Sequence, residues 1–185
     1  DPERVRERLN AAMPDGIAIL DVVPAATSGW ADRLEASEWR IELPGVGPDD
    51  AEAAVAAFLA AEQVEVERLT KKGRRRFDVR PAVFLLDVAR RAATERQETY
   101  AILRLIVRHT TPVVRPDDVV TGLRQIADLA LPAPARMTRL AQGPLDEDSG
   151  TIADPLAVDA AAARPGATVV SATPDPQRRG PDRGT

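Results

Sequence analysis

Apolar and polar residues are arranged in short blocks along the chain, with two different spacings. Within residues 37–43, charged and apolar side chains alternate from Glu38 to Leu43, which predicts a β-strand with one buried face. Helical spacing follows Pro-Asp-Asp at Pro48 and again at Pro116, and proline and acidic residues are favoured in a first helical turn. The side chains expected to face the core are Val55, Phe58 and Leu59 in the first of these helices and Val119, Val120, Leu123, Ile126 and Ala130 in the second.

The remaining apolar runs predict further strands between these helices. The strands are expected at residues 64–70, 76–79, 83–88, 101–107 and 136–140. Lys72-Gly73 is typical of a tight turn, so the first two of these strands are expected to form a hairpin. The chain opens with a helix signal, in which Asp1 caps and Pro2 takes the first helical position, and residues 17–23 read as one more strand.

The order of these elements predicts an α+β fold. Strand, helix and returning strand occur twice, which is typical of a ferredoxin-like split β-α-β sandwich with helices on one sheet face and the other face available. We expect one such domain at residues 37–145. Residues 1–24 are expected to be the remnant of a preceding unit of the same kind, and residues 146–185 a mostly disordered tail with little apolar surface to bury.

Composition narrows the possible chemistry. The chain has no cysteine and one histidine, so it offers neither thiolates for an iron–sulfur cluster or a disulfide nor a multi-histidine metal site. We expect no cofactor and no bound metal. No run of about 20 apolar residues and no signal-peptide pattern is seen, so we expect a cytoplasmic protein with no membrane contact.

Charge is unevenly distributed along the chain. Residues 1–62 contain 5 basic and 13 acidic groups, residues 63–140 contain 16 and 9, and residues 141–185 contain 4 and 7. A basic middle segment therefore lies inside a protein whose net charge is −4. Such a segment suits a polyanionic partner, although a charged hairpin tip is also typical of a solvated, aggregation-resistant edge.

The basic residues gather at the predicted hairpin turn and on one later strand. Arg104 and Arg108 lie four residues apart and hence on one face of that strand, and Arg115, Arg136 and Arg139 are expected near its ends. These groups can contact RNA phosphates with little base readout. The expected RNA-binding residues are Lys71, Lys72, Arg74, Arg75, Arg76, Arg80, Arg104, Arg108, His109 and Arg115.

Catalytic signals are weak. His109 can act as a general base or a phosphate contact, but a lone histidine at a strand end is more often a hydrogen-bonded structural residue. The acidic run at residues 146–148 lacks calcium-loop spacing, and Gly45-x-Gly47 lacks the third glycine and the lysine of a phosphate loop. No catalytic set is recognisable, so an enzyme is the least supported of the alternatives.

Four segments carry a family resemblance: residues 31–37, residues 70–80 with Thr-Lys-Lys-Gly and Phe-Asp-Val-Arg, residues 108–116 and residues 138–145. They resemble the radical-SAM-linked bacterial domain of unknown function, over about residues 1–150. That family's domain begins before the position of Asp1, which implies a truncated domain. The resemblance also implies a radical-SAM protein as partner and, from the family's frequent gene neighbours, a link to RNA or ribosomes.

Together these observations predict a non-catalytic accessory domain associated with a radical-SAM enzyme. It is expected to bind RNA or a ribonucleoprotein through the basic hairpin. The alternative is a protein-docking module without nucleic-acid contact, which the separation of acidic and basic segments also suits.

Overall fold

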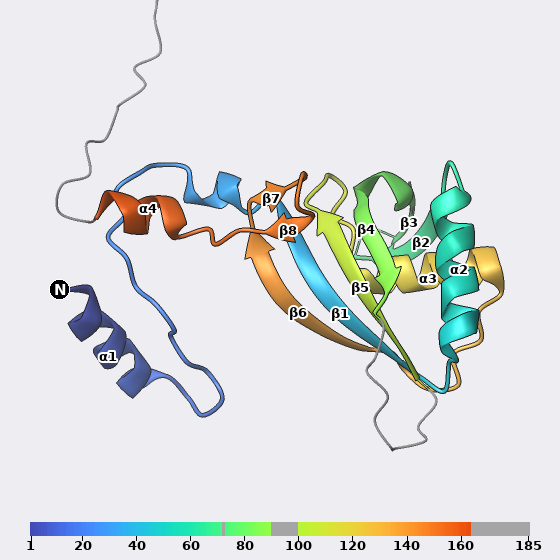
Figure 1. Ribbon diagram of the computed structural model, residues 1–185, viewed down its shortest axis with the longest axis horizontal. Coiled ribbons are helices and arrows are strands. Elements are labelled where there is room, and N and C mark those ends of the chain that lie inside the picture. The colour runs from blue at the N-terminus through green and yellow to red at the C-terminus, as the bar shows by residue number, and fades with distance from the viewer. Residues whose placement is uncertain (72, 90–99, 164–185) are drawn as a thin grey trace, which may run out of the picture. The chain divides into compact units, whose positions relative to one another are not determined.

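The computed structural model of the chain describes residues 1–71, 73–89 and 100–163 (Figure 1). Its described residues divide into two compact units. The larger unit is Gly29–Pro155, and the smaller one combines residues 1–28 with residues 156–163. Because the larger unit contains the main sheet and the hydrophobic core, it is described first.

A four-stranded antiparallel sheet forms the centre of the larger unit (Figure 1). Its order is β4 (Val83–Val88), β5 (Tyr100–Arg108), β1 (Ala36–Pro44) and β6 (Arg136–Gly143). Together with two long helices, this sheet confirms the predicted α+β class. Apart from a separate hairpin, the element order is β-α-β-β-α-β, the order of a split β-α-β arrangement.

Helices α2 (Pro48–Ala60) and α3 (Pro116–Ala127) cover one face of the sheet. Both begin with proline followed by two aspartates. The negative charges of these aspartates interact favourably with the positive N-terminal end of the helix dipole. The core between helices and sheet is built from fully buried aliphatic residues and one phenylalanine: Ile41, Leu43, Phe58, Leu103, Leu105, Val119 and Leu123.

Gly122 of α3 marks a close approach between elements. A Cβ at this position would lie 2.7 Å from Val64 Cγ1 and 3.0 Å from Phe58 Cε2. Glycine therefore lets α3 lie directly against α2 and the start of the hairpin.

The inward positions predicted for the helices are partly wrong. Leu59 is 39% exposed and Ile126 is 37% exposed, and Ala130 lies beyond the end of α3 on the surface. The helix ends because Asp128 adopts a left-handed conformation with φ of 49°, and this turn directs Leu129 into the core in place of Ala130.

The predicted hairpin is confirmed. β2 (Glu65–Thr70) pairs antiparallel with β3 (Gly73–Asp78), so the second strand begins three residues earlier than expected. Gly73 has a φ of 110°, a conformation that favours glycine. Val66 and Phe77 form a buried cross-strand pair on the face toward the core, and the short helix η2 (Arg80–Ala82) leads into β4.

A short hairpin covers part of the opposite sheet face, which was expected to be available. It consists of β7 (Leu145–Asp146) and β8 (Thr151–Ile152). Arg104 on that face donates to the Gly150 carbonyl at 2.8 Å, and Ile106 on the same face is fully buried. A Cβ on Gly143 would lie 2.2 Å from the Ala153 carbonyl oxygen, so glycine permits the chain after β8 to lie against the end of β6.

The smaller unit contains α1 (Pro2–Ala12) and α4 (Ala157–Ala162). The predicted cap is confirmed, since Asp1 accepts a hydrogen bond from the Glu3 amide at 3.0 Å. The strand predicted at residues 17–23 is wrong. The segment forms no strand, and the side chain of Asn10 binds the amide and the carbonyl of Ile19 in place of a neighbouring strand.

The segment expected to be a mostly disordered tail begins at residue 146. Up to residue 163 it forms β8 and α4, and polar contacts, some of them between residues distant in the sequence, replace the missing apolar burial. Asp159 of α4, for example, accepts hydrogen bonds from the amides of Ala26 and Thr27. Residues 164–185 lie outside the described residues. The interpretation of residues 1–24 as a remnant stays a prediction.

Candidate anion-binding pocket

A pocket of about 570 Å³ opens at the end of the sheet where α3 begins. It lies on the core side of the sheet, between β1, β6 and the segment that leads into α3. Its lining residues are Ser37, Trp39, Val107, His109, Val113, Val114, Arg115, Pro116, Asp117, Met137, Arg139 and Gln142. We call it the α3 pocket.

Two arginines border the α3 pocket from different elements. Arg115 is the N-cap residue of α3, and Arg139 lies on β6 with its guanidinium carbon 5.6 Å from the centre of the Trp39 ring. Neither guanidinium forms an ion pair with any residue that the structure describes. Asp117 is the one carboxylate among these lining residues, so the two arginines outnumber it.

His109 forms part of the polar wall of the α3 pocket. Its Nε2 lies 2.6 Å from Ser37 Oγ, and its Nδ1 lies 2.5 Å from the Leu34 carbonyl oxygen. Because a carbonyl oxygen only accepts, Nδ1 donates, and in the neutral imidazole Nε2 accepts from the serine hydroxyl. The contact has the length of a nucleophile–base hydrogen bond. However, Ser37 is 4% exposed within the sheet, so the pair fixes the imidazole at the pocket wall.

Asp118 connects the pocket to the basic hairpin. Its Oδ2 accepts from the Arg115 amide and from Arg68 Nη1 of β2, both at 2.8 Å. Arg68 also donates to the Val113 carbonyl at 3.1 Å and lies over the Phe77 ring. Arg75 stands directly across from Arg68 in the hairpin, so it lies on the hairpin face that meets the pocket segment.

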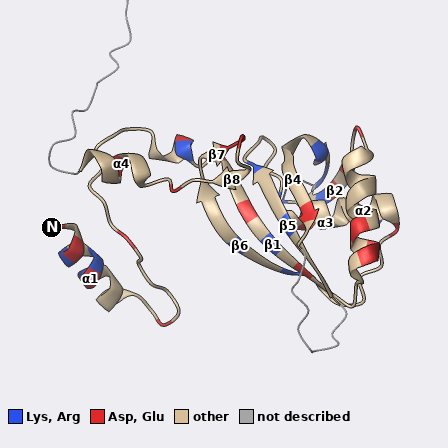
Figure 2. Cartoon of the chain, viewed as in Figure 1, with Lys and Arg blue, Asp and Glu red and all other residues tan. Residues whose placement is uncertain are grey.

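The hairpin arginines differ in their partners. Arg74 pairs with Glu67 at 2.9 Å, and Arg76 pairs with Glu65 at 3.0 Å, which neutralises one face of the hairpin. Lys71 and Arg75 form no ion pair with a described residue. Lys72 lies outside the described residues. Figure 2 shows basic residues around β2 and acidic residues on α2.

Three other predicted RNA-binding residues hold the fold together. Arg80 donates to the carbonyls of Leu59 and Val83, which ties the end of α2 to β4. Arg104 pairs with Glu38 at 2.7 Å.

The third of these residues, Arg108, anchors the β7–β8 hairpin. It pairs with Glu147 at 2.7 Å and lies 4.9 Å from the centre of the Phe84 ring. The hydrogen bond from Arg108 holds the pKa of the exposed Glu147 carboxyl below its ordinary value.

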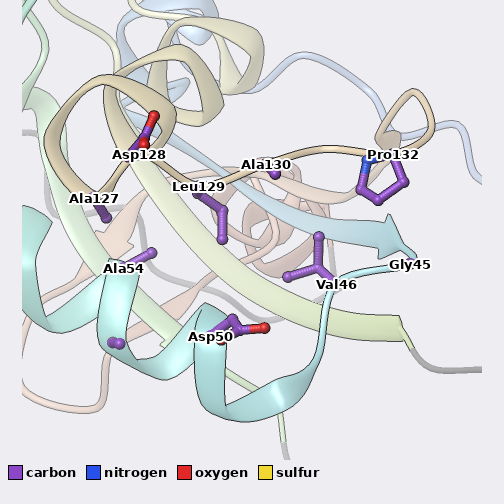
Figure 3. A pocket seen from close by; sticks show the side chains of 10 residues that line it. Gly45, Val46, Asp50, Ala54, Ala127, Asp128, Leu129, Ala130 and Pro132 are labelled. Atoms are coloured by element: carbon purple, nitrogen blue, oxygen red, sulfur yellow. The ribbon is translucent and has the colours of Figure 1, made fainter.

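A second hollow of about 420 Å³ lies between α2 and the segment after α3 (Figure 3). It is lined mainly by small and apolar residues, with Asp50 and Asp128 as its carboxylates. Figure 3 shows these two carboxylates pointing in different directions, so they do not form a pair. Among the described residues, no group of three or more His, Asp or Glu side chains is placed to hold a metal ion.

Sequence reasoning missed several residues of the α3 pocket. Trp39 and Met137 look like ordinary core residues in the strand pattern, and Ser37 and Gln142 stand beside each other only because β1 pairs with β6. Arg139 was placed near a strand end, but no spacing in the sequence brings it to Arg115. The alternation of apolar and charged residues around Trp39 is the one feature of the sequence that indicates a residue of this pocket.

The fold and the pocket define a class of protein: a small α+β protein with a cationic, partly aromatic pocket beside a basic hairpin. The chain belongs to the DUF2344 family of uncharacterized proteins conserved in bacteria, whose model matches residues 1–116. This confirms the resemblance to a bacterial domain of unknown function. The match covers three of the four resembling segments and ends before residues 138–145.

Two further comparisons gave no relative. No curated protein and no solved structure matches the chain. In the part of the chain that the structure describes, no helix has the length and apolar character needed to cross a membrane.

Proposed function

We propose that this protein binds RNA through a cationic track. The track consists of Lys71 and Arg75 on the hairpin and Arg115 and Arg139 at the α3 pocket. The observation that carries the proposal is that none of these four side chains forms an ion pair with a described residue, whereas neighbouring arginines such as Arg68, Arg74 and Arg76 do.

The contacts of Arg68 support the continuity of the track. Arg68 stands across from Arg75 and donates to Val113, which lines the pocket together with Arg115 and Arg139. The Asp118 carboxylate already neutralises Arg68. Arg68 therefore links the hairpin to the pocket segment and adds little positive charge to the track. Unneutralised cations in a row suit a phosphate backbone, since each phosphate contact releases condensed counterions.

RNA binding is tested with a single-stranded oligonucleotide at two salt concentrations. For single strands, each contacted phosphate contributes about 0.7 to the slope of log K against log salt. The double variant Lys71→Glu/Arg75→Glu should therefore bind more weakly and reduce that slope by about 1.4. The matched control is Arg124→Glu/Arg136→Glu, which changes the net charge equally at exposed positions outside the track. Equal losses in the two double variants would contradict a localised track.

We also propose, from the family resemblance, that the protein is a cytoplasmic accessory to a radical-SAM enzyme and supplies no catalytic group of its own. Affinity purification of the protein with and without ribonuclease treatment tests this role. Recovery of a radical-SAM protein supports it. If that recovery survives both ribonuclease treatment and the Lys71→Glu/Arg75→Glu change, protein docking becomes the better description.

A further inference from the structure

We propose that the α3 pocket holds one nucleotide, with its phosphate between Arg115 and Arg139 and its base against Trp39 and Met137. The inference deepens the proposed RNA binding and rests on it for one of two sources of the ligand, an unpaired nucleotide of bound RNA. The other source is a free nucleoside monophosphate, which carries the same two chemical groups.

The dimensions and walls of the pocket suit a ligand with a planar apolar part. Its volume of about 570 Å³ falls within the usual range for small-molecule sites. Trp39, Val113, Val114 and Met137 provide apolar walls. Where the Arg139 guanidinium leaves the Trp39 ring uncovered, the indole gives a base an apolar contact surface that tolerates any base, because every base has a π-face.

The phosphate position follows from the charges. Arg115 and Arg139 line the pocket from two different elements, the N-cap of α3 and strand β6, and neither is neutralised by a described carboxylate. Arg139 is held by its contact with the Trp39 ring, so less side-chain freedom is lost when it binds an anion. Guanidinium groups bind phosphate oxygens in a bidentate manner, which fixes the ligand's orientation.

The polar wall can recognise the base edge. Gln142 is half-buried in the lining, and its side-chain amide makes no hydrogen bond to a described residue. An amide offers both a carbonyl acceptor and an NH₂ donor, the groups that match base edges. His109 and Ser37 already hydrogen-bond to each other, so they form part of this wall. Gln142 is therefore the side chain left to hydrogen-bond with the edge of the base.

The experiment uses the fluorescence of Trp39. The full chain has two tryptophans, and Trp30→Phe leaves Trp39 as the only one. This protein is titrated with AMP, CMP, GMP and UMP, with ribose 5-phosphate, with adenosine, and with a short single-stranded RNA. At least one monophosphate should change the emission saturably, and ribose 5-phosphate and adenosine should each bind about tenfold more weakly because one contact group is missing.

Two variants and two matched controls locate the site. Val113→Phe adds a ring at the rim without changing charge, and Leu140→Phe makes a similar addition at a comparably exposed position outside the lining, 55% against 59% exposed. Arg139→Gln removes one phosphate contact, and Arg136→Gln makes the same change on the same strand outside the pocket. Val113→Phe and Arg139→Gln should weaken monophosphate binding by about tenfold or more, and the controls should not.

The outcomes separate the inference from the proposed function. If monophosphates leave Trp39 emission unchanged, or if Val113→Phe binds as well as Leu140→Phe, the nucleotide pocket is wrong, even where RNA still binds through the hairpin. If monophosphates bind and RNA does not, the RNA proposal fails and the pocket stands as a site for free nucleotides. If RNA binds and loses affinity in Val113→Phe, the ligand is a nucleotide of that RNA.

Discussion

One carboxylate, Asp118, holds together the hairpin and the start of α3. It accepts a hydrogen bond from the backbone amide of the N-cap residue Arg115 and pairs with Arg68, and its side chain is 7% exposed. The sequence identifies this position, because an acidic residue at the third helical position commonly accepts from the N-cap amide. The partner Arg68 lies 50 residues away, so only folding reveals the pair.

Replacing this carboxylate should weaken both stability and binding. Asp118→Ala leaves Arg68 without its carboxylate and removes the cap, which together should lower the free energy of unfolding by about 3 kcal/mol. Urea denaturation with an unchanged m-value measures the loss. The control Asp117→Ala, an exposed change in the same turn, should cost about 0.5 kcal/mol. Similar costs for the two changes would show that the link between the hairpin and α3 contributes nothing.

At the scale of elements, the β7–β8 hairpin is fastened by two arginines of β5. Arg104 binds the Gly150 carbonyl and Arg108 binds Glu147, and the pKa of Glu147 is held below the ordinary value by that hydrogen bond. Hydrogen bonds from Ser149 likewise hold the pKa of the exposed Asp146 carboxyl low. The same two arginines were predicted to contact RNA, and that prediction stays open.

The attachment of this hairpin should depend on pH. Since folding lowers the pKa of Glu147, its contribution is fully present above the ordinary value of 4.5 and is lost as the pH falls through the lower value of the folded protein. Amide NMR shifts of Thr151 and Ile152, followed from about pH 6 to about pH 3, should report this transition. Glu147→Gln should remove part of it, whereas Asp148→Asn should not. A transition unchanged by Glu147→Gln would contradict the anchoring role.

At the scale of the whole molecule, the hydrophobic core belongs to one unit. All of its buried members lie between Ile41 and Leu129, within Gly29–Pro155. Helix α1 has no buried residue, so the smaller unit adds little to this core. The core has its own sheet, two covering helices and an anchored hairpin, which is the usual content of an independently folding domain.

A shortened chain of residues 29–155 should therefore fold cooperatively. Its melting temperature should lie within about 5 °C of that of the full chain, because the core and the main sheet lie wholly within these residues. Thermal denaturation followed by circular dichroism provides the measurement. A broad or missing transition would mean that the smaller unit is required for the fold.

Elements with strong periodic patterns were predicted well, and elements that depend on a partner were not. The helices after Pro48 and Pro116 and the strand at residues 37–43 carry their own signals, namely caps and alternation. The segment at residues 17–23 has the composition of a strand, but it finds no neighbouring strand among the described residues. A strand requires hydrogen bonds from another segment, which its own sequence does not encode.

The sequence by itself determined that a basic segment exists, that part of it forms a hairpin, and that cysteine and multi-histidine chemistry is excluded. Only the tertiary structure decided which cations remain unneutralised. Glu65, Glu67, Asp118 and Glu147 reach their arginines through strand pairing and long-range packing. The α3 pocket arises in the same way, because antiparallel pairing of β1 with β6 brings Trp39 opposite Arg139. Local sequence sets propensity and charge, whereas contacts between distant residues exist only after the chain has folded.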